Sequence, residues 1–315
     1  MSLLNCTLNL IYPPISNQEG VWFWENEDVR EYTKNSKIYM LVHRKELKFL
    51  DIDVSLILEG KFQFKIVMGD FVSSIFSFQF TNDMDMLVGS DPILIESGEK
   101  IFRIRREAND EVLYWATPDK ILYDIITKNI SMELYKEEDI EVLQDFELLY
   151  AGISKKNNSF SRLFEEAHHG RLNILSNEHT KESKARMTDE LMILLFEIKW
   201  FNINVMGLGA QGLDNLFDYT DDEMAIIADA EKAFVSMLDS KYNKVKFKEY
   251  PKGDDGLYEK GLEGYIYSIN YDLRLFTDKN DFHGRYNNFN GRDSILVYGD
   301  DVQIIKFHEN KLNKL

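Results

Sequence analysis

The spacing of apolar residues changes along this chain, and that change limits the fold more than any other feature of the sequence. Apolar and polar residues alternate over 61–66 and again over 76–80, which is typical of half-buried strands. The range 92–106 predicts a hairpin. Thr117-Pro118 predicts the start of a short helix, because threonine suits the N-cap and proline suits the first helical position. The first third of the chain is therefore expected to be rich in β-structure.

The pattern then becomes mixed. Alternation over 140–150 predicts a second hairpin, and the apolar run 191–201 predicts a buried strand. The ranges 159–175 and 221–240 have the spacing of amphipathic helices. Strands return over 263–307, with a turn at Gly299-Asp300. Together these patterns predict an α+β protein.

We expect three domains, because the patterns change near residues 128 and 252. They are a β-rich sensing or interaction domain with a connecting helix (1–128), a small mixed α/β domain (129–252) and a C-terminal β extension (253–315). No Gly/Ser linker separates the first two, so we expect them to be packed together rather than tethered.

Composition excludes several classes of protein. The 315 residues carry a formal net charge of −17, which argues against coating of nucleic acid by unspecific charge. The single cysteine, Cys6, excludes an intrachain disulfide and a cysteine metal cluster. The first 14 residues do not resemble a signal peptide, and no apolar run approaches the roughly 18 residues of a membrane span. We therefore expect a cytoplasmic protein with no membrane partner.

Glu231 is the strongest local anomaly. At 100° per residue it falls in the middle of an apolar stripe on the predicted helix, whereas Asp229 falls on the opposite side with Asp222. A carboxylate in such a stripe costs several kcal/mol unless it is paired or binds a metal. Glu231 is thus either a rim or ion-paired residue, or a metal-binding carboxylate in a cleft.

Two short motifs on either side of this region suggest a family. Glu231 is followed by Phe234-Val235 and then by Lys241-Tyr242-Asn243. Upstream, Tyr150-Ala151-Gly152 closes a predicted strand and is followed by a polar loop and by Arg162-Leu163. This arrangement resembles the GIY-YIG nucleases over about residues 138–250. The predicted order of hairpin, helix, strand and helix is similar as well.

The resemblance implies a set of site residues and a cofactor. The catalytic residues would be Tyr150, Arg162, His168, His169 and Glu231, and the substrate-binding residues would be Gly152, Lys155, Asn243 and Lys244. Glu231 would hold Mg²⁺ or Mn²⁺, Arg162 would neutralise the phosphate, and Tyr150 would be the general base. Arg171 is an alternative to Arg162, since it falls in the apolar stripe if Gly170 leaves the helix unbroken.

The resemblance also implies a function, and one departure leaves an alternative open. We expect a metal-dependent endonuclease acting on DNA rather than RNA. By analogy of architecture it would be a bacterial anti-phage defence effector, whose β-rich domain recruits a protein partner or assembles with itself. However, 140–143 lacks the Gly-Ile-Tyr-like triplet of the first signature strand, and Tyr135 is a poor substitute. The alternative is a catalytically degenerate binding or assembly protein.

Lysines cluster near the expected site although the chain is acidic. Lys155-Lys156 follows Tyr150, and a predicted basic strand over 241–252 follows the helix that carries Glu231. These two runs are expected to lie on either side of a cleft and to bind backbone phosphates, or else to form a solvated face.

Overall fold

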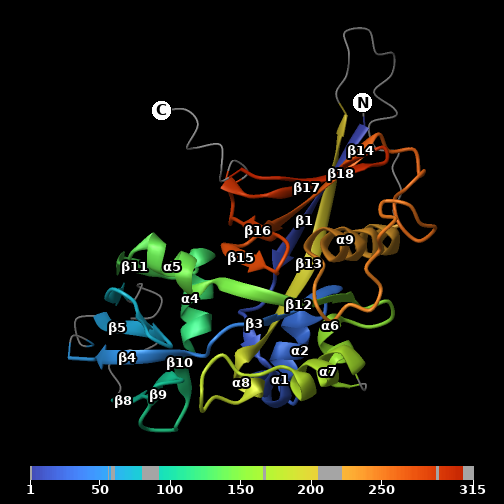
Figure 1. Ribbon diagram of the computed structural model, residues 1–315. Helices are drawn as coiled ribbons and strands as arrows, with labels where there is room; N and C mark the ends of the chain where they lie inside the picture. The colour runs from blue at the N-terminus through green and yellow to red at the C-terminus, as the bar shows by residue number, and fades with distance from the viewer. Residues whose placement is uncertain are drawn as a thin grey trace. The chain divides into compact units, whose positions relative to one another are not determined.

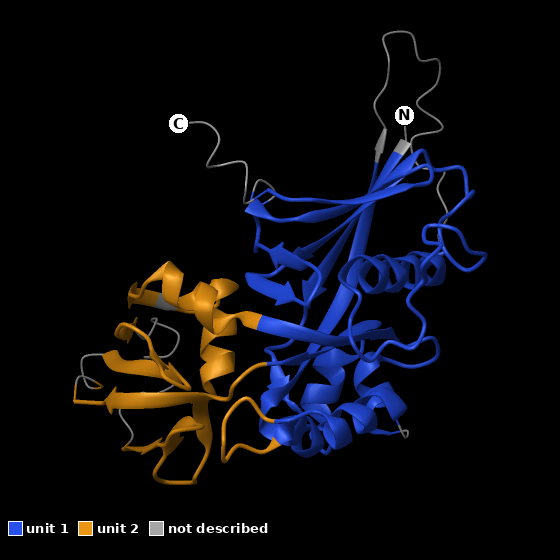
Figure 2. Cartoon of the chain, in the orientation of Figure 1, with its two compact units in different colours: residues 1–43, 146–179, 187–315 blue, residues 44–145, 180–186 orange. Residues whose placement is uncertain are grey.

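The structure is a computed structural model that describes residues 2–55, 57, 61–79, 92–165, 168–204, 222–288 and 291–307. The chain divides into two compact units (Figure 2). Unit 1 comprises Met1–His43, Phe146–His179 and Met187–Leu315, and unit 2 comprises Arg44–Asp145 and Thr180–Arg186. Both contain helices and strands, so the chain is a mixed α/β protein with much sheet, as the sequence predicts.

Unit 1 is built on one ten-stranded sheet with the order β16-β15-β12-β3-β13-β1-β14-β17-β18, and β2 pairs with β13 at its side. The strands are β1 (Ser2–Leu10), β2 (Ile15–Ser16), β3 (Ile38–His43), β12 (Asp145–Ile153), β13 (Leu191–Asn204), β14 (Gly264–Asn270), β15 (Leu273–Phe276), β16 (Asp281–Gly284), β17 (Ser294–Tyr298) and β18 (Asp301–Ile305). The long strands β1 and β13 run side by side through the unit (Figure 1).

The centre of the sheet is buried, and its sequence shows why. All six residues of β3 are buried, and the first half of β13 is almost entirely apolar, as expected for strands covered on both faces. β3 pairs antiparallel with β12 on one side and with β13 on the other. β1 pairs antiparallel with β13 and parallel with β14.

The helices of unit 1 are α1 (Asn17–Phe23), α2 (Glu27–Thr33), α6 (Ser159–Phe164), α7 (His169–Asn177), α8 (Met187–Glu190) and α9 (Glu223–Leu238). α9 confirms the predicted helix over 221–240. Asp222 caps its first turn by accepting a hydrogen bond from the Ala225 amide, and Asp239 ends it in the left-handed conformation. Phe234 of α9 packs edge-on against Phe282 of β16, with ring centroids 5.2 Å apart.

Unit 2 lies in sequence between the two strands β3 and β12. Its elements are β4 (Leu47–Asp53), β5 (Lys61–Met68), β6 (Phe71–Val72), β7 (Phe76–Gln79), β8 (Ile93–Ser97), β9 (Phe102–Arg106), β10 (Val112–Ala116), α4 (Pro118–Ile126), β11 (Ser131–Leu134) and α5 (Glu137–Leu143). The strands form two sheets, in the orders β11-β7-β5-β4 and β10-β9-β8, with β6 beside β5. Phenylalanine side chains at alternating strand positions pack together in the core of unit 2; the ring of Phe62, for example, contacts those of Phe78 and Phe102.

Several local predictions are confirmed. The alternating segments form β5 and β7, the range 92–106 forms the antiparallel pair β8–β9, and Thr117 caps α4 with Pro118 in its first turn. The apolar run at 191 begins β13, and β17 and β18 pair across the predicted turn. Among the described helices, none is long and apolar enough to cross a membrane.

The expected domain boundaries do not coincide with the two units, and one predicted hairpin is wrong. The range 137–143 is the helix α5, so its apolar residues Ile140 and Leu143 are buried at helical spacing. The strand that pairs with β12 is β3, about a hundred residues upstream. β1 and the strands after residue 263 belong to the same sheet as β12, within unit 1.

Candidate functional site

Two tyrosines lie next to each other on the antiparallel pair β3–β12. Tyr39 of β3 is opposite Gly152 of β12, and its ring stacks on that of Tyr150 with centroids 6.1 Å apart. A Cβ atom at Gly152 would lie 2.6 Å from the Tyr39 hydroxyl and 2.6 Å from a ring carbon of Tyr150. Glycine is needed here because it leaves room for both rings. Gly152 therefore shapes the site rather than binding a ligand through a side chain.

An Ile-Tyr pair lies on the strand next to Tyr150. Ile38 and Tyr39 form the start of β3 and are opposite Ile153 and Gly152 of β12. Tyr135, the substitute considered from the sequence, follows β11 in unit 2 and stacks on Phe76. The signal that could have identified Tyr39 is the fully apolar run 38–42, which predicts a buried strand.

The Lys241-Tyr242-Asn243 segment holds the edge of β12 in place. The Tyr242 amide donates to the Leu149 carbonyl at 2.9 Å. The Asn243 side chain accepts from the Ala151 amide at 2.9 Å and donates to the Ala151 carbonyl at 2.8 Å. Asn243 is buried and its carboxamide is occupied by both backbone groups of Ala151, the residue after Tyr150. Asn243 thus supports the strand that carries Tyr150, and its expected contact with substrate stays a prediction.

The same segment also binds α7. Lys241 pairs with the carboxylate of Glu178, and the Tyr242 hydroxyl donates to that carboxylate at 2.9 Å. These contacts and burial act on the pKa of Glu178, and the net shift is downward. The segment therefore joins α9, β12 and the end of α7.

His168 begins α7 and has a defined tautomer. Its Nδ1 accepts from the Arg171 amide at 2.9 Å, and its Nε2 lies 2.7 Å from the Tyr39 hydroxyl. Because Nδ1 is an acceptor, neutral His168 carries its proton on Nε2 and donates to Tyr39. Burial, followed by the charges of Arg162 and Arg171, lowers the pKa of His168 to about 4, so it is neutral near pH 7.

Tyr39 and Tyr150 also act on each other electrostatically. Burial is the main cause that raises the pKa of Tyr39, and the negative charge that Tyr150 carries when ionised is the second. Burial also raises the pKa of Tyr150 above its usual value, with the charge of Glu231 as the second cause.

The two candidate arginines have different surroundings. The positive charge of Arg162, on α6, acts on Tyr39, Tyr150 and His168. Arg171 donates to the Asn17 side chain at 2.8 Å and lies over the Phe164 ring. The predicted single helix over 159–175 is instead α6 and α7, with His168 as the N-cap of α7. His169 is exposed as the first residue of α7 and takes no part in the tyrosine contacts.

Glu231 lies near both tyrosines. It is partly buried on α9, and its charge raises the pKa of Tyr39 and of Tyr150. Burial is the main cause that raises the pKa of Glu231 to about 7. The positive charges of Lys155 and Lys232 oppose this rise, and the negative charge of Asp255 adds to it. The charges of Glu231 and Arg162 thus both act on Tyr150, while His168 contacts Tyr39.

Lys155 and Asp255 are two exposed charged residues whose charges act on Glu231. The Lys155 Nζ is 3.9 Å from the Asp255 carboxylate, which also pairs with Lys232. The expected role of Lys155 in binding the substrate stays a prediction.

Asp229 is a buried carboxylate that the helical wheel misplaced. It is 0% exposed and accepts from the hydroxyls of Tyr250 at 2.7 Å and Tyr267 at 2.8 Å, and from the Leu257 amide at 2.7 Å. Burial raises its pKa despite these bonds. The wheel placed it on the solvent side, but the segment 250–257 and β14 cover that side of α9. Asp229 thereby fixes the loop that carries Asp255.

Glu231 fits a divalent cation as a single carboxylate ligand. Among the described residues its carboxylate has no hydrogen-bond or ion-pair partner, so its partly buried charge is uncompensated. No group of three or more His, Cys, Asp or Glu residues in the described part of the chain is arranged to hold a metal. Mg²⁺ commonly uses one or two protein carboxylates and takes its remaining ligands from water and phosphate.

No known protein family, curated protein or solved structure matches this chain. The geometry above is therefore the basis for any assignment of function.

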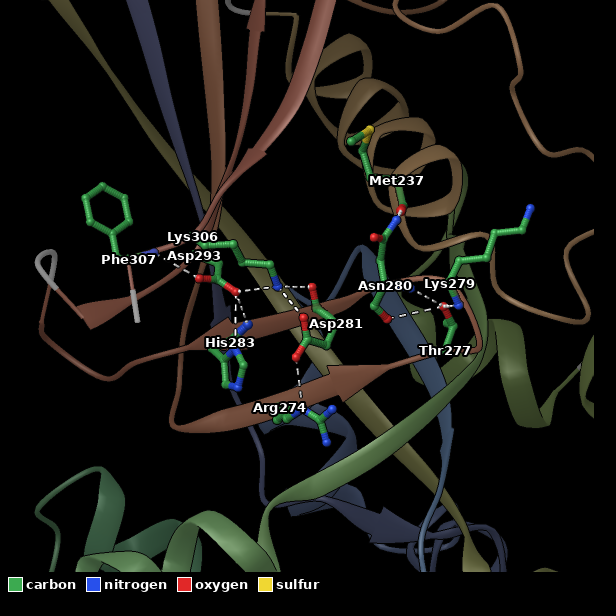
Figure 3. Close-up of polar contacts among 10 residues, drawn as sticks. All are labelled: Met237, Arg274, Thr277, Lys279, Asn280, Asp281, His283, Asp293, Lys306 and Phe307. Atoms are coloured by element: carbon green, nitrogen blue, oxygen red, sulfur yellow. Dashed lines mark hydrogen bonds and ion pairs between the residues drawn. The ribbon is translucent and has the colours of Figure 1, made fainter. Parts of the chain in front are cut away.

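A second polar cluster, on β15–β18, stabilises the sheet and is not a candidate binding site. Figure 3 shows Lys306 between the carboxylates of Asp281 and Asp293, with His283 beside Asp293 at 3.2 Å. Asp293 also accepts from the amides of His283 and Phe307. The turn after β15 caps α9, because Asn280 donates to the Met237 carbonyl at 2.7 Å and Thr277 to the Leu238 carbonyl at 2.6 Å. This cluster fixes the end of the helix that carries Glu231.

Proposed function

We propose that unit 1 is a divalent-metal-dependent endonuclease that hydrolyses phosphodiester bonds, with DNA as its expected substrate. The observation that carries the proposal is the stacking of Tyr39 on Tyr150 under the influence of the charges of Arg162 and Glu231; the Glu231 carboxylate has no partner among the described residues. The antiparallel pair β3–β12, the helix α6, the strand β13 and the helix α9 also follow the order of a GIY-YIG domain. Tyr39 fills the place of the missing first triplet, which weakens the alternative of a degenerate binding protein.

The catalytic task needs an activated water and stabilisation of negative charge on the phosphorus centre. Tyr150 would accept a proton from the attacking water once its own phenol proton has passed to the water shell of the bound cation; burial opposes this loss, because it raises the pKa of Tyr150. Tyr39, whose ring stacks on that of Tyr150 and whose hydroxyl accepts from His168, would donate to the Tyr150 oxygen and stabilise its negative charge. Arg162 stabilises both the phenolate and an adjacent phosphate by its positive charge.

Glu231 would hold Mg²⁺ or Mn²⁺. When bound, the cation would polarise the phosphate and stabilise the leaving oxygen. Glu231 must be ionised for this role, and its pKa of about 7 means that it loses a proton near neutral pH. We therefore expect cleavage to fall as the pH is lowered through 7.

Plasmid cleavage tests the proposal. Supercoiled DNA, linear DNA and RNA are incubated with Mg²⁺ or Mn²⁺ and the wild type, Glu231→Ala or Tyr150→Phe. Each variant should lose at least about 100-fold in rate, in the range usual for general acid–base groups. Glu223→Ala is the matched control, because Glu223 is exposed on the first turn of the same helix and should leave the rate unchanged.

A second readout does not need turnover. Mg²⁺ should raise the melting temperature of the wild type and of Glu223→Ala but not that of Glu231→Ala, because a ligand stabilises only the protein that binds it. Equal cleavage by the wild type and Glu231→Ala would overturn the proposal.

A further inference from the structure

A cavity of about 620 Å³ lies beside the carboxylate site, and its lining is unusually basic for this chain. The segment 244–253, with Lys232 and Asp255, forms its walls. Five of the lining residues are lysines and only two, Glu249 and Asp255, are acidic. In a protein of net charge −17, this local excess of cations indicates an anionic ligand.

Two of these lysines are available to a ligand. Lys232 pairs with Asp255, Lys246 with Asp239 and Lys252 with Asp300. Among the described residues, Lys244 and Lys248 have neither an acidic partner nor a hydrogen bond, and both are exposed. The predicted basic strand is absent, since residues 241–251 form turns. The two free lysines therefore point from a folded loop instead of an extended strand face.

An aromatic residue with a constrained backbone also lines the cavity. Phe247 has φ of 46°, in the left-handed region that residues with a Cβ rarely adopt. Such backbone strain is concentrated at binding sites. Phe247 and Tyr250 also line a neighbouring cavity of about 410 Å³. Cations alternating with aromatic rings in a groove are typical of surfaces that bind a single nucleic-acid strand.

The cavity adjoins the proposed catalytic carboxylate. Lys232 follows Glu231 in α9, and Asp255 acts on the pKa of Glu231 while lining the cavity. The Asp229 carboxylate fixes the 250–257 loop against α9, so the cavity wall and Glu231 are held to the same helix. A strand bound in the cavity would lead directly to Glu231.

We propose that this lysine cavity binds the phosphodiester backbone of one nucleic-acid strand next to the bond that is cut, with Lys244 and Lys248 contacting phosphates. This inference rests on the proposed function, from which it takes the scissile bond. The cavity, rather than the net charge of the protein, then sets affinity for the substrate.

Binding of a labelled single-stranded oligonucleotide to full-length Glu231→Ala protein tests this without cleavage. Adding Lys244→Glu and Lys248→Glu removes two phosphate contacts. The slope of log affinity against log salt should fall in magnitude by about 1.4, and affinity should fall about 25-fold at 0.1 M salt. Duplex DNA is measured in parallel and should bind more weakly than the single strand.

The matched control carries Lys34→Glu and Lys199→Glu, two exposed lysines outside the cavity, with the same change in net charge. It should alter affinity less than about threefold because distant exposed charges are screened. The milder Lys244→Gln and Lys248→Gln variant should reproduce the change in salt slope if the glutamate variant misfolds. Equal weakening in the cavity and control variants, or no weakening in either, would overturn the inference.

The two proposals fail separately. If wild-type protein cleaves DNA but the cavity variants bind the oligonucleotide normally, the cavity assignment is wrong and the endonuclease assignment stands. If the cavity variants lose binding but no metal supports cleavage by the wild type, the endonuclease assignment is wrong and the cavity still binds a nucleic-acid strand.

Discussion

Tyr39 is 1% exposed, and its hydroxyl accepts from His168. The backbone amide of Arg171 fixes the tautomer of His168, so a main-chain group at the start of α7 leaves the Tyr39 proton available for another acceptor. In the proposed mechanism that acceptor is the phenolate oxygen of Tyr150, so Tyr39 would act through Tyr150 instead of touching the substrate.

Replacing Tyr39 by Phe should therefore change the pH dependence of cleavage. Losing a hydrogen bond to a charged group costs about 1.5–3 kcal/mol, so kcat should fall about 10- to 150-fold at pH 7. The limb of the profile that reports Tyr150 should move up by about one to two pH units, with KM little changed.

The control for this variant is Tyr32→Phe, since Tyr32 is 71% exposed and its profile should match the wild type. A uniform loss of rate at every pH would show that Tyr39 has only a packing role.

Glu231 should make the protein less stable at higher pH. Its pKa is about 7 in the folded state and 4.5 in the unfolded state, so between these values the unfolded chain releases a proton that the folded protein keeps. Stability is thus lost as the pH rises through this window, by up to about 3 kcal/mol at 1.36 kcal/mol per pKa unit. The free energy of unfolding of Glu231→Gln, relative to wild type, should rise from near zero at pH 4 to about 3 kcal/mol at pH 8.

Urea unfolding at several pH values measures this difference. Glu223→Gln, on the exposed first turn of α9, should show no comparable trend. A difference that is the same at pH 4 and pH 8 would contradict the shifted pKa.

Among the elements, β12 is held by the side chain of Asn243, which makes the hydrogen bonds that a neighbouring strand would make. Asn243 bonds both backbone groups of Ala151, and Ser240 donates to the same Asn243 oxygen at 2.6 Å. Asn243→Ala leaves two buried backbone groups unsatisfied, which should cost about 2–4 kcal/mol. Hydrogen exchange at the Ala151 amide should become faster, and cleavage should fall with it.

Lys244→Ala is the matched neighbour, because Lys244 is exposed and has no partner among the described residues. It should change stability by less than about 0.5 kcal/mol. Unchanged hydrogen exchange at the Ala151 amide in Asn243→Ala would mean that water replaces Asn243 as the hydrogen-bond partner of the Ala151 backbone.

The elements also show which features of the fold can be predicted from the sequence and which cannot. α9 was predicted because sixteen residues keep one period, and β5 and β7 because alternation is strict. Asp229 was misplaced because a helical wheel assumes one solvent side, whereas β14 and the 250–257 loop cover the second side of α9. The pairing of β3 with β12 was missed because a whole unit separates the strands, and register depends on contacts that local patterns do not carry.

For the molecule as a whole, the insertion of unit 2 between β3 and β12 is the main organising fact. The chain leaves the tyrosine-bearing strand at His43 and returns at Asp145. Within unit 2, Arg44 closes this loop by donating to the Leu143 carbonyl at 2.7 Å and to Asp119 at 2.6 Å. Arg44 is 2% exposed, and burial raises the pKa of Asp119 against the lowering effect of Arg44.

We expect the two units to melt separately, because each has its own core. Arg44→Leu leaves the buried Asp119 carboxylate without its ion-pair partner, which should cost about 3–5 kcal/mol. Calorimetry should then show one transition lowered by about 10 °C or more, while the transition of unit 1 stays in place. Arg105→Leu removes surface pairs with Glu96 and Asp110 in the same unit. It should lower the free energy of unfolding of that unit by no more than about 1 kcal/mol. Equal shifts of both transitions in Arg44→Leu would contradict independent melting of the two units.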